Sequence, residues 1–480
     1  MSIDTLIDQA FAPISSAVSS VVFYTEPFTG YDIRLILIWL AGVAIFFTLY
    51  LGLPNLKYFG HAISIARGRY DRPTGKGQIN SLQALMMSLS GTVGLGNIAG
   101  VAVAISVGGP GAAFWLCVMG ILSMATKLAE STMGVKYRHS PDPSDHELTL
   151  GGPMYYIRAA FSQRGLPKVG KFIAYLFCIC CIGGAIGGGN MFQANQTFQQ
   201  VVNVSGGAEG FMADKGWMFG IFLAVLTGIV VIGGVTSIAR LSSKIVPVMA
   251  TIYLGAGLYV LAVFYADIPG AFVTIITSAF SPEAGMGAVI GAILMGVQRA
   301  AFSNEAGMGS GAIVHAAAKT DEPLTQGFVG MLGPFIDTVA ICMMTALVIV
   351  VTGAYEGTQG MAGVELSSRA FEQGISWFPY ILAVTVFLFA FSTLITWCYL
   401  GEVCAVYLFG KRSVVIMTYK VIFLCFTVVG SAATLSNIID FSDAIFLSMA
   451  VPNCIALLML APELKRDMRD YLQRLENKQK

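Results

Sequence analysis

Long apolar segments, separated by short polar ones, run through nearly the whole chain. A helix needs about 20 mostly apolar residues to cross a bilayer. Segments that meet this requirement, some of them interrupted by glycine or polar residues, lie at 33–53, 80–107, 110–136, 170–200, 216–234, 244–267, 285–317, 325–352, 376–400, 413–432 and 437–461. The pattern predicts an all-α integral membrane protein with 11 transmembrane helices.

Two further apolar runs, at 151–161 and 269–280, are too short to cross a bilayer. Each lies between two predicted spans, which favours helices that lie in the membrane interface or re-enter the bilayer. The first residues, MSIDTLIDQAF, are acidic where a signal peptide begins with basic residues. We therefore expect the N-terminal segment to be retained and to form a short amphipathic helix on the membrane.

The composition agrees with a membrane location. Of the 480 residues, 56% are apolar and 11% are charged, and the mean hydropathy is +0.73, whereas soluble chains usually carry about 25% charged residues. The net charge is only +1, so membrane lipid is an expected partner and nucleic acid is not. The nine cysteines lie in or beside apolar runs and the four histidines form no paired motif, so neither a disulfide framework nor a transition-metal site is expected.

The distribution of basic residues predicts the orientation of the spans. If the N-terminus is outside, the outward segments hold Arg34, Lys215 and Arg369 and little else. The alternate loops and the tail at 462–480 hold most of the other lysines and arginines. Cytoplasmic loops carry such an excess. We expect a multi-pass protein of the plasma membrane, the inner membrane in a Gram-negative bacterium, with its N-terminus outside and its C-terminus in the cytoplasm.

The second and seventh predicted spans are both interrupted, and they lie five spans apart. The second contains four glycines between Gly91 and Gly100, and the seventh contains the polar run SNEAG at 303–307, followed by further glycines. Interrupted spans at matching positions of two halves indicate an inverted repeat with a binding site near the membrane midplane. Gly96 and Gly100 also form a GxxxG motif, which by itself more often marks close helix packing.

Several ionisable residues fall within predicted spans. Arg299, Glu305 and Asp337 lie near mid-depth, where they are placed to neutralise one another in part. Such residues indicate either a functional site or a structural ion pair between helices. Lys127 and Glu130, three residues apart in the third span, fit a packing pair better than a proton relay.

The fourth and ninth spans carry further candidate residues. The fourth has a smooth glycine face at 183–189, followed by Asn190 and Gln193 on one helical face. These amides either reach a small polar ligand or make interhelical hydrogen bonds. In the ninth, Thr393 offers a hydroxyl to a cation, and Trp397 on the same face either contacts the ligand or belongs to an interfacial aromatic belt.

Five sequence motifs resemble those of one transporter family. They are GTVGLGNIAGVAVAISVGGPGAAFW at 91–115, GGPMYYI at 151–157, AAFSNEAGMGS at 300–310, AAAKTDEP at 316–323, and FSTLITW at 391–397 with GE at 401–402. The chain resembles the alanine or glycine:cation symporters, also called sodium:alanine symporters, and the hydropathy matches over nearly its whole length.

This resemblance implies the LeuT-like fold of the amino acid-polyamine-organocation superfamily, a five-plus-five inverted repeat with one extra N-terminal span. The expected division is an external segment at 1–32, the extra helix at 33–53, a first repeat of spans 2–6 at 80–267, a second repeat of spans 7–11 at 268–461, and a cytoplasmic tail at 462–480.

The resemblance also implies which residues bind. The break in the second span would receive a substrate carboxylate on backbone groups, and two aromatic side chains would close over a small substrate side chain. The expected substrate-binding residues are Thr92, Leu95, Gly96, Asn190, Gln193, Phe302, Ser303, Thr393 and Trp397. The expected sodium ligands are Ser90, Val93, Asn97, Ala390 and Thr393.

The function implied is secondary active transport of a small neutral amino acid, alanine or glycine. Import would be coupled to Na⁺ as symported ion, through alternating access to the two sides of the membrane. The sequence contains no GxxxxGK[ST] motif for ATP. The alternative is a proton-coupled carrier, with Glu305 or Asp337 as the titrating group, or a carrier that prefers glutamine or serine. A channel or an intramembrane enzyme fits the sequence less well, and no enzyme activity is expected.

Overall fold

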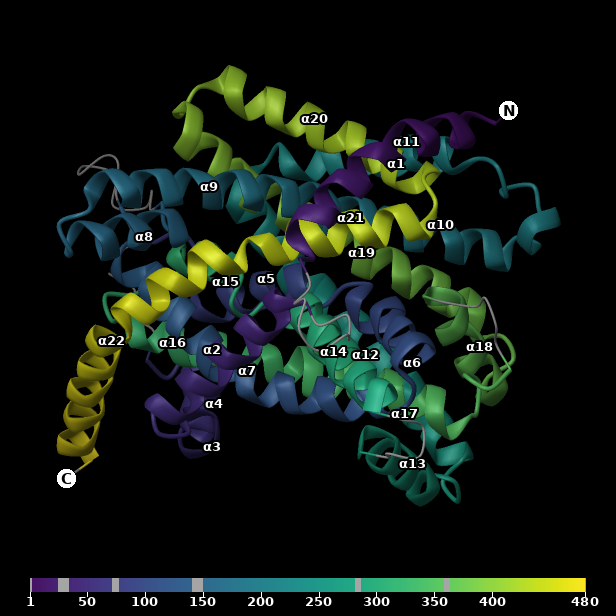
Figure 1. Ribbon diagram of the computed structural model, residues 1–480, viewed down its shortest axis with the longest axis horizontal. Helices are drawn as coiled ribbons and strands as arrows, with labels where there is room; N and C mark the ends of the chain where they lie inside the picture. Colours follow the sequence, from purple (N-terminus) through teal and green to yellow (C-terminus); the bar gives the residue numbers. More distant parts are fainter. Residues whose placement is uncertain are drawn as a thin grey trace.

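The computed structural model describes residues 2–24, 34–70, 77–139, 150–280, 286–357 and 363–479, and these ranges are almost entirely helical (Figure 1). The helices of the first half are α1 (Ile3–Val22), α2 (Leu35–Tyr50), α3 (Pro54–Lys57), α4 (Phe59–Ala66), α5 (Ser81–Thr92), η1 (Gly96–Gly100), α6 (Val101–Gly108), α7 (Gly111–Lys136), α8 (Pro153–Ser162), α9 (Pro167–Ile186), η2 (Gly187–Met191), α10 (Phe192–Val204), η3 (Gly207–Glu209) and α11 (Gly216–Val231).

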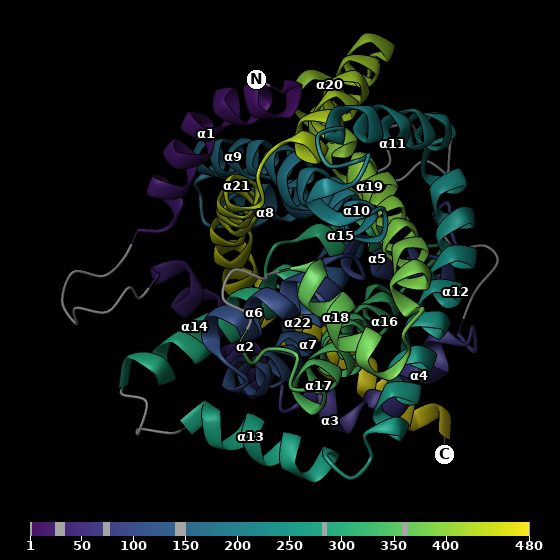
Figure 2. The ribbon, with the colours of Figure 1, turned by 90° about the vertical axis from the view of Figure 1, so that its right-hand side faces the viewer.

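The second half continues in the same way. Its helices are α12 (Gly234–Val263), α13 (Ile268–Phe280), α14 (Met286–Asn304), α15 (Ser310–Ala316), α16 (Pro323–Pro334), η5 (Phe335–Cys342), α17 (Met343–Val351), α18 (Val364–Gly374), α19 (Phe378–Phe409), α20 (Ser413–Ala432), α21 (Leu435–Ser448) and α22 (Ala450–Gln479). The two ends of the chain lie on opposite sides of the molecule in Figures 1 and 2.

All eleven predicted apolar segments coincide with helices, and this confirms an all-helical membrane protein. Within the described residues, seven helices are long and apolar enough to cross a bilayer, or eight when the bent pair of 81–92 and 96–108 is counted as one span. Helices α2 and α11, with 16 residues each, are too short to be counted among these. The number of eleven spans, the inverted repeat and the domain boundaries therefore stay predictions.

The two interrupted spans are broken in the structure. The axes of the 81–92 and 96–108 segments differ by 53°, and η1 continues directly after the bend. In the seventh span, α14 ends at Asn304 and α15 begins at Ser310. The linking residues Glu305, Gly307 and Gly309 have φ values of 58°, 92° and 84°. Glycine adopts such left-handed angles readily, which explains why glycines are concentrated there.

Backbone hydrogen bonds join the ends of the two broken spans. The Gln78 amide donates to the Ala317 carbonyl at 2.8 Å, and the Lys319 amide donates to the Ile79 carbonyl at 2.7 Å. Gly77 precedes this bridge with φ 135°, and any β-carbon there would collide with the backbone around Ala318. These bonds hold the start of the second span, which precedes its break, to the end of the seventh span, which follows its break.

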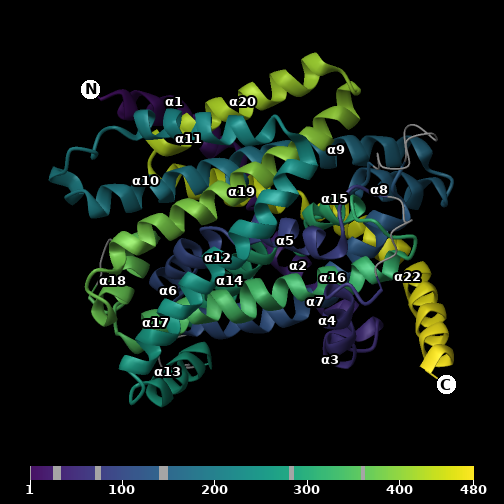
Figure 3. The same cartoon turned by 180° about the vertical axis from the view of Figure 1, so that it is seen from behind.

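The helices around the breaks fall into two groups. Helix α7 packs against α14, α15 and α16, whereas α9, η2 and α10 pack against α19, α20 and α21. Figure 3 shows α9 and α10 beside α19 and α20. The predicted glycine face of the fourth span makes the second contact possible: a β-carbon at Gly183 or Gly184 would meet Ile445 or Met449 of α21. Close approach of backbones at small residues is the usual way in which membrane helices associate.

The three segments expected to lie outside the spans are also helical. Helix α8 covers the run at 151–161 and α13 the run at 269–280, and α13 lies at the edge of the molecule (Figure 2). Helix α1 is capped by Ser2 and packs along α21. There the ring centroids of Phe11 and Phe441 are 5.1 Å apart, and the Ser15 hydroxyl donates to the Asn437 carbonyl.

Candidate functional site

At the first break, backbone amides donate hydrogen bonds to neutral side chains. The Gly94 amide donates to Oδ1 of Asn97 at 3.0 Å, and the Leu95 amide donates to Oε1 of Gln193 at 2.9 Å. Gln193 comes from α10 and is held in turn by a hydrogen bond from its Nε2 to the Gly188 carbonyl. All five residues are buried. The break is therefore a buried set of donors with no charged partner among these hydrogen bonds.

The second break is bonded to charged side chains. The amides of Gly307 and Gly309 both donate to Oε1 of Glu130, at 2.8 and 2.9 Å. Lys127 donates from Nζ to the Asn304 carbonyl at 3.1 Å. Glu305, inside the break, accepts a hydrogen bond from the Ser310 hydroxyl. These charged groups are almost completely buried.

One indole bridges the two breaks. Nε1 of Trp397 lies 3.2 Å from the Gly91 carbonyl and 3.2 Å from Oε1 of Glu305. The indole ring also packs directly on Gly189, where a β-carbon would overlap it. Trp397 is only 1% exposed, so the interpretation that it belongs to an interfacial aromatic belt is wrong.

A cluster of aromatic rings adjoins this bridge. Phe446 of α21 lies 5.1 Å from Trp397 and 5.0 Å from Phe302, measured between ring centroids, and Phe302 lies 5.2 Å from Phe192. Gly96, at the start of η1, faces the Phe302 ring, to which a β-carbon would approach within 3.3 Å. Phe302 and Trp397, both predicted to contact substrate, thus lie at the breaks, and both pack on Phe446.

Two predicted cation ligands from different spans are in contact. The Thr393 hydroxyl donates to the Ser90 carbonyl at 3.1 Å, so this oxygen pair joins α19 to the end of α5. The Ser90 hydroxyl donates to the Ser392 carbonyl at 2.8 Å. Val93 and Ala390, the other two backbone candidates here, are fully buried.

Two further predicted residues, Asn97 and Ser303, donate hydrogen bonds to a carboxylate. Nδ2 of Asn97 donates to Oδ1 of Asp337 at 2.6 Å and to the Ser303 hydroxyl at 3.2 Å, and the Ser303 hydroxyl donates to Oδ2 of Asp337. Thr338 also donates to this carboxylate, at 3.0 Å. Oxygen ligands of this kind suit a hard cation. Asp337, considered in the sequence as part of a charge cluster or as a titrating group but not as a cation ligand, thus lies with Asn97 and Ser303.

Two predicted substrate ligands point elsewhere. Asn190 donates from Nδ2 to the Phe423 carbonyl of α20 at 2.6 Å, which corresponds to the interhelical alternative for this amide. The Thr92 hydroxyl bonds within its own helix, to the Leu89 carbonyl at 3.4 Å. The structure therefore brings Gln193 to the first break but not the Asn190 side chain.

The expected mutual neutralisation of Arg299, Glu305 and Asp337 is wrong for the arginine. Arg299 instead forms a buried ion pair with Asp443 of α21, which also accepts a hydrogen bond from Nε2 of Gln298 at 2.6 Å. Sequence spacing does not show that α14 and α21 are neighbours. The available signal for Asp443 was that the last apolar segment contains two acidic residues, Asp440 and Asp443.

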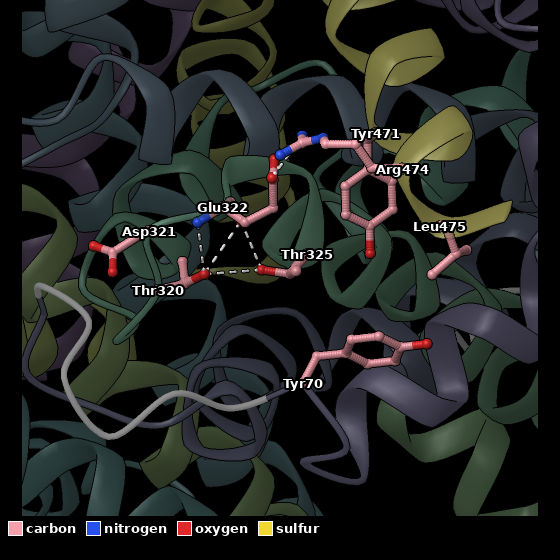
Figure 4. A pocket seen from close by; sticks show the side chains of 8 residues that line it. All are labelled: Tyr70, Thr320, Asp321, Glu322, Thr325, Tyr471, Arg474 and Leu475. Carbon is pink, nitrogen blue, oxygen red and sulfur yellow. Dashed lines mark hydrogen bonds and ion pairs between the residues drawn. The ribbon is translucent and has the colours of Figure 1, made fainter. Parts of the chain in front are cut away.

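A separate cavity of about 270 Å³ lies away from the predicted ligands. Its lining residues are Tyr70, Thr320, Asp321, Glu322, Thr325, Tyr471, Arg474 and Leu475 (Figure 4). Arg474 of α22 and Glu322 form an exposed ion pair at 2.8 Å across one side of it. None of the residues predicted to bind substrate or sodium lines this cavity, so the breaks remain the candidate site.

Comparisons with known proteins identify the family of the chain. A model of the sodium:alanine symporter family matches residues 16–480. The chain is 38% identical over 428 residues to the sodium/alanine symporter AgcS of Methanococcus maripaludis, a match that covers 88% of this chain and 91% of that protein. It is 32% identical over 441 residues to the probable sodium/glutamine symporter GlnT of Bacillus subtilis, covering 91% and 88%.

A solved structure shows the same fold. The structure of MhsT in complex with L-phenylalanine matches with a TM-score of 0.51 at 18% identity, over 80% of this chain and 98% of that chain. Fold and relatives together define a multi-pass membrane transport protein, not an enzyme. The chain belongs to the sodium:alanine symporter family.

Proposed function

We propose that the protein imports a small neutral amino acid, alanine or glycine, together with Na⁺. It works by alternating access in the plasma membrane, with its N-terminus outside and its C-terminus in the cytoplasm. The single observation that carries this proposal is the position of Trp397, whose indole contacts the Gly91 carbonyl and Glu305 at the two breaks and packs on Phe446. A substrate bound beside this indole would contact both interrupted spans.

The first break is the proposed seat of the substrate carboxylate. Its buried amides at Gly94 and Leu95 already bond to neutral oxygens of Asn97 and Gln193. A carboxylate forms stronger hydrogen bonds to such donors than an amide oxygen does. A substrate is therefore able to displace these oxygens, with the backbone of Leu95 and Gly96 and the freed Gln193 amide group as its donors.

The surrounding rings favour a small side chain. Phe302 and Trp397 both pack on Phe446, at centroid distances of 5.0 and 5.1 Å, and Gly96 lies against Phe302. We propose that the hydroxyls of Ser303 and Thr393 bind the polar end of the substrate. Thr92 and Asn190 take a supporting role, since their side chains bond to neighbouring backbone.

Sodium is proposed to bind where α5 meets α19. The ligands there are the carbonyls of Ser90, Val93 and Ala390 and the Thr393 hydroxyl, which already touches the Ser90 carbonyl. A second cation position is proposed at Asn97 and Ser303, beside the Asp337 carboxylate. Because both positions adjoin the first break, bound sodium and bound amino acid should tighten each other by the same factor.

Uptake by purified protein in proteoliposomes tests this function. An inward sodium gradient without a pH gradient should drive accumulation of labelled alanine, and an equal potassium gradient should not. No accumulation with sodium would overturn the proposal. The kinship with a probable sodium/glutamine symporter favours a second candidate, a glutamine carrier. Competition by unlabelled alanine, glycine, serine and glutamine separates the two, and accumulation under a pH gradient alone identifies proton coupling.

A further inference from the structure

Lys127 and Glu130 of α7 do not bond mainly to each other. Nζ of Lys127 and Oε2 of Glu130 are 3.9 Å apart, whereas the other carboxylate oxygen, Oε1, accepts hydrogen bonds at 2.8–2.9 Å from the amides of Gly307 and Gly309. Lys127 in turn donates to the Asn304 carbonyl at 3.1 Å. Each member of the pair is therefore bonded to the backbone of the second break.

The two charges lie on opposite sides of the break. Lys127 bonds to the last residue of α14, where a helix leaves carbonyl groups without an intrahelical partner. Glu130 bonds to amides that precede Ser310, the first residue of α15. Cations favour the carbonyl end of a helix and anions favour the amide end. A pair three residues apart on one helix thus matches both exposed ends at once.

A second helix completes the contact. Asn453 of α22 donates from Nδ2 to Oε1 of Glu130 at 2.8 Å and to the Gly307 carbonyl at 2.8 Å. Oε1 of Glu130 consequently receives three hydrogen bonds. Gly307 and Gly309 have left-handed φ values, and their two amides converge on one carboxylate oxygen, as backbone amides do in anion sites.

We propose that Lys127 and Glu130 form a resident ion pair that clamps the second break in its unwound shape. The pair occupies this break permanently, as the zwitterionic substrate occupies the first break during transport. Both residues are positioning residues. This inference rests on the proposed function for its consequence in transport, but the shape of the break is measurable without transport.

A plain packing pair is the alternative, and it predicts a different response to mutation. When two buried charges only neutralise each other, their replacement by neutral side chains of similar size is often harmless. When each charge instead holds part of the backbone, the double replacement loses both sets of hydrogen bonds. The double variant therefore separates the clamp from the packing pair.

Hydrogen–deuterium exchange of the purified full-length protein measures the break directly. Glu130→Gln should raise the exchange rate of the segment 305–309 at least tenfold, because a neutral oxygen is the weaker acceptor. Lys127→Met with Glu130→Gln should show the same rise, and Lys127→Arg should retain protection close to that of the wild type. The matched control is Glu402→Gln, which removes the charge of a pair with Lys420 at 3.1 Å and should leave this segment unchanged.

Wild-type protection in Glu130→Gln, or its recovery in the double variant, overturns the clamp. If Glu130→Gln exchanges faster along its whole length, the fold has been lost, and Glu130→Asp replaces it. The shorter side chain should then cause a smaller rise confined to 305–309, and unchanged exchange in that variant contradicts the proposal.

Transport of the same variants tests the consequence. The maximal rate of alanine uptake in Glu130→Gln should fall at least tenfold, while KM for alanine stays within threefold, because Glu130 does not contact the substrate. A wild-type protein without sodium-driven uptake refutes the proposed function alone, since faster exchange in Glu130→Gln still supports the clamp. A larger change in KM than in rate refutes the clamp as a positioning device.

Discussion

The two breaks differ in the charge of the side chains that bond to their backbone groups. At each, a helix stops inside the protein and leaves backbone groups that cannot bond to water. At the first break the amides of Gly94 and Leu95 bond to the neutral side chains of Asn97 and Gln193. At the second, the amides of Gly307 and Gly309 bond to a buried carboxylate.

The difference indicates which break exchanges its occupant. A carboxylate with three hydrogen bonds is costly to move, because any orphaned partner or charge remains buried. Neutral amide oxygens are weaker acceptors, and a ligand carboxylate replaces them with a gain in hydrogen-bond strength. We infer that the first break binds and releases ligand while the second serves as a fixed scaffold, and the following variants test this distinction.

The largest effect is expected from Gly94→Val. A β-carbon there would lie 2.7 Å from the Thr393 hydroxyl and 2.9 Å from Oε1 of Gln193, so a larger side chain must displace proposed ligands. Alanine uptake should fall about 100-fold or more in protein that still inserts into the membrane. Gly255→Val on α12 is the control, because a β-carbon there meets no atom within 4 Å. Near-normal uptake by Gly94→Val would show that the first break is not the site.

Gln193→Glu should come next. The added negative charge would lie beside the Leu95 amide, where we place the substrate carboxylate, and like charges repel strongly in a buried site. KM for alanine should rise by roughly tenfold or more, measured as initial uptake in proteoliposomes. Gln200→Glu is the matched control, since Gln200 bonds to Ser368 and the Pro379 carbonyl instead. An equal rise in both variants contradicts the assignment.

Trp397→Ala should relax the size limit. Removal of the indole opens space beside Gly189 and Phe446, so leucine and phenylalanine should inhibit alanine uptake about tenfold better than in the wild type. Trp397→Phe keeps a ring but loses the hydrogen bonds to Gly91 and Glu305, and it should keep the size limit while uptake slows. Unchanged selectivity in Trp397→Ala would remove Trp397 from the binding site.

Thr393→Val should weaken the binding of sodium. The valine keeps the shape of the side chain but loses the hydroxyl beside the Ser90 carbonyl. The sodium concentration for half-maximal uptake should rise about tenfold, the order expected for one lost polar contact in a buried site. Thr427→Val is the control, because that hydroxyl bonds only to its own helix at 3.4 Å. If sodium dependence is unaltered, the cation lies elsewhere.

The smallest effect on binding is expected at the second break. Gly307→Ala forces an alanine to φ near 92°, which should lower the free energy of unfolding by about 1–2 kcal/mol, followed as a lower unfolding temperature in detergent. Its KM for alanine should stay within about twofold of the wild type, because the substrate bonds to the other break. A large change in KM with normal stability would reverse the roles given to the two breaks.

Local sequence was sufficient for the helices and for the positions of both breaks. Runs of apolar residues predicted α7, α9 and α19, and glycines with SNEAG marked the places where regular helix stops. Helices form in the apolar runs because unpaired backbone groups are costly in lipid and a helix pairs them within one segment. The motifs likewise indicated the family that the comparisons then showed.

The partners of charged side chains were much less predictable. Spacing placed Arg299 near Glu305 and Asp337, but its carboxylate partner is Asp443, 144 residues further along the chain. The sequence also gave Lys127 and Glu130 only a local pairing. Hydrogen bonds of this kind depend on which helices are neighbours. The local periodicity of the sequence does not determine which helices are neighbours.

The sequence by itself determined that the chain is helical, belongs in a membrane, resembles sodium-coupled carriers and is interrupted at two matching places. Only the tertiary structure decided what each interruption bonds to: neutral amides at Gly94 and Leu95, and the α7 ion pair at Gly307 and Gly309. The physical reason is range. Unwinding is a property of a few consecutive residues. The Gly94 amide still finds its partner locally, in Asn97, but the amides of Leu95, Gly307 and Gly309 require side chains that folding brings from more than 90 residues away.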